Sequence, residues 1–254
     1  MTKNKLAFVS GATSGIGQAT AEILANNQWD VIITGRRIDR LKELASRLKT
    51  KYGVQIYALD FDVQDREQVK RSLTPHSELL SNIDLLVNNA GLALGKSSFH
   101  QGLESDWETM INTNLKGLIY VTKELIPIMI KNMKGQIINV SSTAARDMYL
   151  GGNVYSATKS AVDALTKSLR LDLLEYNIKV SSIAPGMVRT EFSEVRFHGD
   201  KQKAESVYQG FEPLYAADVA DAIYYIASRP ANVHIGDLLI TCTAQANSSV
   251  VYKS

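Results

Sequence analysis

The 254-residue sequence is poor in cysteine and proline, with one and five respectively. A single cysteine, Cys242, excludes an internal disulfide and a cysteine-rich metal site, and it is typical of a protein from a reducing compartment. The four histidines, His76, His100, His198 and His234, lack the spacing of metal ligands. We therefore expect no metal and a cytoplasmic location.

Long hydrophobic runs and blocks of like charge are also missing. The apolar run in MTKNKLAFVSGATSG is too short for a secretion signal or a membrane span. The net charge is only +2, and no dense basic block with interleaved aromatics is present, so neither a nucleic acid nor a membrane is expected as a partner. With 45% hydrophobic and 21% charged residues, the composition is that of a globular protein.

Short apolar runs alternate with longer helical patterns along the chain. The runs, predicted as strands, span residues 5–10, 30–35, 54–59, 83–89, 135–142, 178–186 and 237–242, and the helical patterns include 16–28, 39–53, 66–80, 104–132 and 154–176. Such alternation indicates βαβ units and a parallel sheet with helices on both faces. We predict one α/β domain over residues 1–254: a doubly wound Rossmann fold of about seven strands.

Residues 190–213 interrupt this alternation. The stretch TEFSEVRFHGDKQKAESVYQGFEP is polar, contains two glycines and falls between a strand and the next helix. Because a long irregular insertion after a strand is more often functional than idle, we predict a substrate lid here.

Three glycines follow the first predicted strand. In FVSGATSGIG, Gly11 permits a tight turn, Gly15 permits close approach of a phosphate, and Gly17 permits close packing of the helix on the sheet. The N-terminus of the helix then offers free N–H groups to a pyrophosphate. The alternative is a glycine-rich turn with no ligand.

The end of the second strand indicates which dinucleotide binds. An acidic residue there would bind a ribose 2′-hydroxyl, but DVIITGRR places Gly35 at that point, followed by Arg36 and Arg37. Guanidinium groups match a 2′-phosphate, so we predict NADP rather than NAD. The alternative is a pair of solvated arginines at the start of a helix.

Seven motifs occur in a fixed order: SGATSGIG, DFDV, NNAG, NTNLKG, NVSS, YSATK and APGMVRT. In this order and spacing the chain resembles the short-chain dehydrogenases/reductases over nearly its whole length. NNAGLALG, DWETMINTN, GGNVYSATK and TEFSEVRFHGD resemble most closely the branch of NADP-dependent 3-hydroxy acid dehydrogenases, which act on serine, allo-threonine and 3-hydroxypropionate and reduce malonic semialdehyde.

The resemblance implies four catalytic residues. Tyr155 would be the acid/base, and Lys159, one helical turn later, would stabilise its phenolate together with the oxidised nicotinamide. Ser142 would donate a hydrogen bond to the substrate oxygen. Asn114 would anchor a water that links Lys159 to solvent.

The resemblance also implies the contacts to NADP. These are Gly11, Ser14, Gly15, Ile16, Gly17, Arg36, Arg37, Asp62, Val63, Asn88, Asn89, Ala90, Gly91, Tyr155, Lys159, Pro185, Gly186, Val188 and Thr190. The substrate would meet Ser142 and Tyr155. A 3-hydroxy acid also needs a cation for its carboxylate, for which Arg196 is the first candidate and Arg146 the second. Both could equally be solvated surface arginines.

Three other functions remain open at this point. The same catalytic residues would serve a carbonyl or ketoacyl-type reductase with an uncharged or carrier-bound substrate. A redox sensor that binds NADP without turnover would not need the proton-transfer residues, and a structural interaction protein would leave the glycine loop unexplained. The family resemblance further implies a homotetramer, with a small molecule as the substrate.

Overall fold

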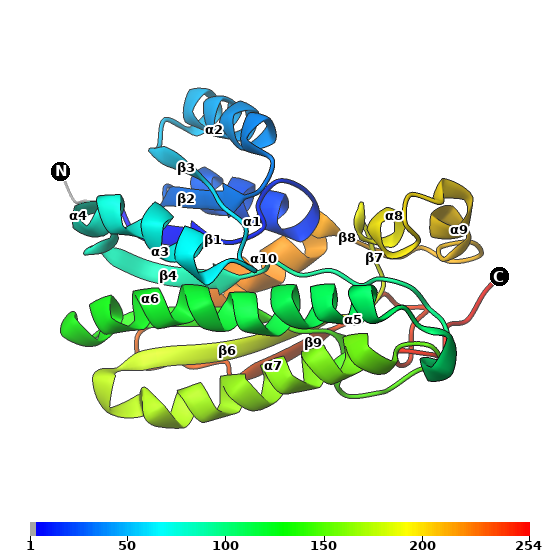
Figure 1. Cartoon of the computed structure of the whole chain (residues 1–254). Helices are drawn as coiled ribbons and strands as arrows, with labels where there is room; N and C mark the ends of the chain where they lie inside the picture. The colour runs from blue at the N-terminus through cyan, green and yellow to red at the C-terminus, as the bar shows by residue number, and fades with distance from the viewer. Residues whose placement is uncertain (1–3) are drawn as a thin grey trace.

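A seven-stranded parallel sheet forms the centre of the computed structural model, which describes residues 4–254 (Figure 1). Its strands are β1 (Leu6–Val9), β2 (Asp30–Gly35), β3 (Ile56–Asp60), β4 (Ile83–Asn88), β5 (Gly135–Val140), β6 (Ile178–Pro185) and β9 (Asp237–Ile240). They lie in the order β3-β2-β1-β4-β5-β6-β9. The chain adds β2 and β3 on one side of β1 and then β4, β5 and β6 on its other side. This change of side creates a switch point between β1 and β4, where such folds bind ligands.

Helices cover both faces of this sheet. Helices α1 (Gly15–Asn26), α2 (Ile38–Tyr52) and α10 (Ala216–Ala227) pack on one face, and α3 (Arg66–Leu73), α6 (Leu118–Lys131) and α7 (Asn153–Asp172) pack on the other. Alternate residues of the inner strands enter the two cores: on β1, Ala7 and Val9 face one and Leu6 and Phe8 the other. The edge strand β9 is more exposed. Burial on both faces explains why the strands are continuous apolar runs. The predicted doubly wound fold is confirmed.

Two of the predicted helices differ from expectation. The pattern at 66–80 breaks after α3 into a 3-10 turn, Thr74–His76, and the short helix α4, Ser77–Leu80, because Pro75 lacks an N–H to continue the ladder. The pattern at 104–132 comprises α5 (Glu104–Ile111) and α6 joined by a π-helical stretch, Asn112–Gly117. Such wide turns often occur at functional sites.

The predicted lid is not irregular. It contains α8 (Phe192–Arg196) and α9 (Lys201–Ser206), the latter capped by Asp200, whose carboxylate accepts a hydrogen bond from Lys203 N at 3.0 Å. Two short parallel strands, β7 (Val188–Arg189) and β8 (Leu214–Tyr215), flank it. In Figure 1 both helices project beyond the end of the central sheet. The chain end lies beside this segment, where Ser254 N donates to Gly210 O at 2.9 Å.

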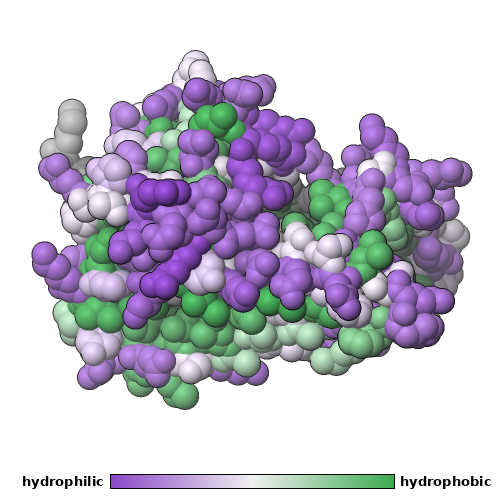
Figure 2. All heavy atoms as spheres, viewed as in Figure 1, coloured by the Kyte–Doolittle hydropathy of each residue, from purple (hydrophilic) through white to green (hydrophobic). Residues whose placement is uncertain are grey.

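One part of the surface is distinctly apolar. In Figure 2 hydrophobic residues gather along α6 and α7, below a polar region over the first half of the chain. Ile119 on α6 and Leu171 on α7 are among the exposed large hydrophobic side chains, at 40% and 77% exposure. Within residues 4–254, no helix is both long and apolar enough to cross a bilayer. Met1 to Lys3, the start of the segment considered above as a signal, lie outside the described residues.

We predict that Gly17→Ala destabilises the fold by about 3 kcal/mol or more. A Cβ at this position would lie 2.3 Å from Gly11 O and 2.4 Å from Asn89 Nδ2, so helix α1 would have to move off the sheet. Urea unfolding measures the effect. Gly53→Ala is the control, because Gly53 has a φ of +71° but nothing within 4 Å of the added carbon; it should cost only about 1 kcal/mol. Equal losses for both variants would contradict the packing role of Gly17.

Candidate active site

A cleft opens at the switch point, beyond the carboxyl ends of β1, β4, β5 and β6. Most of the residues predicted to bind NADP line it, namely Gly11, Ser14, Gly15, Ile16, Arg36, Arg37, Asp62, Val63, Asn89, Ala90, Gly91, Tyr155, Lys159, Pro185, Gly186, Val188 and Thr190, together with Ser142. Residues remote in sequence therefore meet along one surface, with Arg37 toward the end of β2 and Tyr155 on α7.

Three of the residues predicted to bind NADP or to act in catalysis lie behind the lining of the cleft. Gly17 packs α1 against Gly11. Asn88 is buried and donates through Nδ2 to Thr122 Oγ1 and Asn139 Oδ1, both at 2.9 Å. Asn114 is buried as well, and its contacts are described below. Their placement indicates that these three residues hold the lining of the cleft in position and do not touch a ligand directly.

The glycine loop is tied to the end of β4. Gly11 has a φ of +67°, and a Cβ there would come within 2.8 Å of Ala90 Cα, so only glycine fits. Asn89 Nδ2 donates to Ser10 O and Gly11 O at 2.9 and 3.0 Å, while Ser10 Oγ accepts from Asn89 N and Ala90 N, both at 3.0 Å. These bonds hold the loop at the N-terminus of α1, whose first turn carries no acidic residue to compete with a phosphate.

The two arginines after β2 have different partners. Arg36 forms an ion pair with Asp62 at 3.5 Å and is largely exposed. Arg37 lies over the glycine loop: its Nε and Nη2 donate to Thr13 Oγ1, at 3.2 and 2.8 Å, and Nη2 also donates to Ser14 Oγ at 2.9 Å. Arg37 is therefore the better placed of the two for an anion in the cleft. The sequence did not single out Thr13, because only the fold brings its hydroxyl to Arg37.

Tyr155 is 8% exposed, at the inner end of the cleft. Burial raises the pKa of its phenol to about 12, although the nearby Ser142 hydroxyl and the charge of Arg196 work in the opposite direction. The ring of Phe192 packs edge-on against Tyr155, with 5.8 Å between centroids. The lowering of this pKa that the helical spacing suggested is absent from the protein alone, because loss of hydration dominates and raises the pKa. A further cation would be needed to form the phenolate.

Lys159 is buried beside Tyr155. Its Nζ donates to Val140 O at 2.9 Å. Burial lowers the pKa of the ammonium to about 8, while the charge of Asp163, one turn along α7, works in the opposite direction. A Cβ on Gly91 would lie 3.3 Å from Nζ and 3.2 Å from Asn114 Oδ1. Glycine therefore keeps the space between these two groups open.

Asn114 holds the π-helical stretch against the loop after β4. Its Oδ1 accepts from Leu92 N and its Nδ2 donates to Leu92 O, both at 2.8 Å, and Nδ2 also donates to Thr158 Oγ1 at 3.1 Å. Both N–H groups of the side chain are therefore used, while Oδ1 keeps one free acceptor site next to the space beside Gly91 and Lys159 Nζ. The water between Asn114 and Lys159 that the family resemblance implies stays a prediction.

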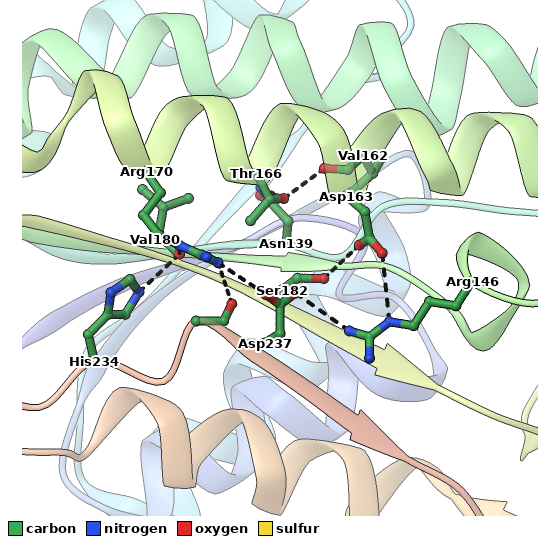
Figure 3. Close-up of polar contacts among 11 residues, drawn as sticks. Asn139, Arg146, Val162, Asp163, Thr166, Arg170, Val180, Ser182, His234 and Asp237 are labelled. Carbon is green, nitrogen blue, oxygen red and sulfur yellow. Dashed lines mark hydrogen bonds and ion pairs between the residues drawn. The ribbon is translucent and has the colours of Figure 1, made fainter.

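Arg146 lies outside the cleft. Figure 3 shows its guanidinium directed at Asp163 on α7 and at Asp237 on β9, with N···O distances of 3.9 and 3.5 Å. Asp163 also accepts from Ser182 Oγ at 2.8 Å. Two carboxylates pair with its charge and it does not line the cleft, so the structure does not favour the substrate role considered for Arg146 as the second candidate.

Arg196 lies next to Tyr155. Its Nε donates to Gly95 O at 3.2 Å, Nη2 donates to the hydroxyl of Tyr149, and the guanidinium carbon is 5.6 Å from the centroid of the Tyr155 ring. Helix α8 of the predicted lid thus brings one cation to the phenol. Arg196 lines a neighbouring pocket with Gly95 and His198 and does not line the cofactor cleft itself, and its role in binding a substrate carboxylate stays a prediction.

A family model for short chain dehydrogenases matches residues 5–201. This protein belongs to the short-chain dehydrogenase family. Serine 3-dehydrogenase of Agrobacterium fabrum is 43% identical over 231 residues, which cover 91% of each chain. NADP-dependent 3-hydroxy acid dehydrogenase of Schizosaccharomyces pombe is 40% identical over 98% of this chain and 96% of its own. A solved closed form of serine dehydrogenase complexed with NADP+ is 41% identical, with a TM-score of 0.91 over 98% of this chain and 99% of that one.

These comparisons confirm the predicted family, and the structural match confirms the predicted fold class. The sequence also led us to expect no metal. Among the described residues, no group of three or more histidine, cysteine, aspartate or glutamate side chains could hold a metal ion.

For this short-chain dehydrogenase we predict a pH signature of the buried Lys159. Between pH 8 and 10.5 the unfolded chain keeps a proton on Lys159 that the folded chain has released. The free energy of unfolding of the wild type should therefore rise by up to about 3 kcal/mol, relative to Lys159→Met, as the pH increases through this window. Urea unfolding across the window measures the difference. Lys167→Met, an exposed lysine on the same helix, should parallel the wild type; a parallel profile for Lys159→Met would contradict the assignment.

Proposed function

We propose that this protein is an NADP-dependent oxidoreductase that transfers a hydride between the hydroxyl-bearing carbon of a small 3-hydroxy acid and NADP. The observation that carries the proposal is one cleft with Arg37 and the glycine loop at one end and Ser142, Tyr155 and Lys159 at the other. The relatives named serine 3-dehydrogenase and NADP-dependent 3-hydroxy acid dehydrogenase, both at least 40% identical, support the substrate class.

The residues present fit NADP. Close approach to the loop is possible because Gly11 and Gly15 carry no side chain, and α1 directs its free N–H groups toward the same place. The Arg37 fork suits a phosphate monoester. When bound, NADP supplies the hydride acceptor and a positive charge on the nicotinamide.

The side chains around Tyr155 then have separate tasks. Tyr155 accepts the substrate hydroxyl proton in oxidation and returns a proton in reduction. Ser142 stabilises the substrate oxygen, where charge changes during the reaction. Lys159 helps the phenol to ionise, because its ammonium is held one helical turn away by Val140 O. Arg196 binds the substrate carboxylate.

We further propose a homotetramer in the cytoplasm. The apolar surface over α6 and α7 supports the assembly, because contiguous exposed apolar surface marks protein contacts (Figure 2). Light scattering should give four times the chain mass of 28.0 kDa; the mass of a single chain would contradict it. The single cysteine supports the location.

The function is tested by the initial rate of NADPH formation with L-serine, L-allo-threonine and 3-hydroxypropionate, each with NADP and with NAD. We expect turnover with NADP and a loss of about 10²- to 10⁴-fold in Tyr155→Phe, which lacks the titrating hydroxyl. The control Tyr225→Phe, 48% exposed on α10, should remain active. If every 3-hydroxy acid is inert while a bulky ketone oxidises NADPH, the protein is a carbonyl or ketoacyl-type reductase. If NADP binds but neither class of substrate is turned over, the protein is a redox sensor.

Arg196→Ala should raise KM for serine more than KM for an uncharged alcohol, by about tenfold, because a charge-assisted pair to the carboxylate is lost. Steady-state kinetics with both substrates measure the ratio. Arg146→Ala is the matched control, since Arg146 pairs with Asp163 and Asp237 instead. Equal increases for the two substrates in Arg196→Ala would refute the assignment.

A further inference from the structure

Glu191 bridges the two sides of the cofactor cleft. It immediately precedes α8, at the base of the lid segment. Its Oε2 accepts from Arg37 Nη1 at 2.9 Å, and its Oε1 accepts from Arg40 Nη1 at 2.7 Å. Burial alone would raise the pKa of this carboxyl, but the bonds from Arg37 and Arg40 hold it below the ordinary value. Glu191 is therefore an anion at neutral pH.

The geometry of Arg37 shows which site this anion fills. Thr13 and Ser14 already accept from Nε and Nη2, so these hydroxyls fix one edge of the guanidinium against the glycine loop. The remaining terminal nitrogen, Nη1, is the one that Glu191 holds. An oxyanion that reaches Arg37 from the cleft without breaking the hydroxyl contacts must use the same nitrogen.

On the proposed function, that oxyanion is the 2′-phosphate of NADP. A guanidinium N–H donates to carboxylate and phosphate oxygens alike, so either group can accept from Arg37 Nη1. They cannot share one nitrogen comfortably, because two anions a few ångströms apart repel each other. The side chains of Glu191, Arg37 and Arg40 are 43%, 43% and 47% exposed. Such half-exposed pairs are weak and exchange readily.

The same stretch of chain closes on the glycine loop. A Cβ added to Gly15 would lie 3.3 Å from the side chain of Thr190, the residue before Glu191. The base of the lid therefore lies close to the loop at Thr190, and Glu191 bonds it to Arg37 and, through Arg40, to α2. Removing the carboxylate from Arg37 would release one of these contacts.

We propose that Glu191 occupies the 2′-phosphate site of the free protein and is displaced when NADP binds. The carboxylate thereby lowers affinity for the phosphorylated cofactor, and its displacement loosens the base of the lid. Because its affinity is lower, the wild type releases NADP(H) faster. An unphosphorylated cofactor leaves the contact in place.

The test compares the wild type with Glu191→Gln, which keeps the shape of the side chain and removes its charge. Calorimetry measures the Kd of 2′-AMP and of 5′-AMP, and fluorescence measures the Kd of NADPH and of NADH. Glu191→Gln should bind 2′-AMP and NADPH roughly three- to tenfold more tightly, because the competing anion is gone. Binding of 5′-AMP and NADH should not change.

Glu194→Gln is the matched control, because it removes the same charge from α8, three residues further along. It should leave all four constants unchanged, which separates the local contact from the net charge. Unchanged or weaker binding of 2′-AMP by Glu191→Gln, with a wild type that binds it, would overturn the inference and leave the proposed function intact. A wild type that binds neither 2′-AMP nor NADPH would overturn the proposed function and this inference with it.

Discussion

The loss of hydration at the inner end of the cleft is the constraint on which the rest of the site depends. It raises the pKa of Tyr155 to about 12 and lowers that of Lys159 to about 8, so both groups are disfavoured as ions. An acid/base with such a pKa is inert near neutral pH. On the proposed function, the chain supplies one buried ammonium and one nearby guanidinium, and the nicotinamide of bound NADP would supply the remaining positive charge. The proposed site would then become active only when the cofactor is present.

The surrounding scaffold keeps this arrangement in place. The side chain of Asn114 fixes the widened helix to the loop after β4, and Gly91 keeps the space beside Lys159 open. The charge of Asp163 stabilises the Lys159 ammonium. Asp163 also pairs with Arg146, which lies four residues after Ser142 in the sequence (Figure 3). Polar contacts therefore join α7, which carries Tyr155 and Lys159, to the edge of the sheet.

Strands buried on both faces could be predicted from the sequence, since each is a short apolar run between turn residues. The cleft could be predicted from motifs that follow those strands. The pairing of Arg37 with Glu191 could not, because the two residues are remote in sequence and meet only through the fold. The same reason explains why the pairing of Arg146 with Asp163 and Asp237 could not be predicted. The direction of the Tyr155 pKa shift depends on burial, which helical spacing does not report.

The most direct test of this account is a pH titration of the Tyr155 phenolate by ultraviolet difference absorbance, wild type minus Tyr155→Phe, with and without NADP. The account predicts that the free protein shows no ionisation of Tyr155 below about pH 11, consistent with a pKa of about 12. With NADP bound, the titration should move several pH units toward neutrality. A phenolate that forms near neutral pH in the free protein, or a titration that NADP leaves unchanged, would contradict it.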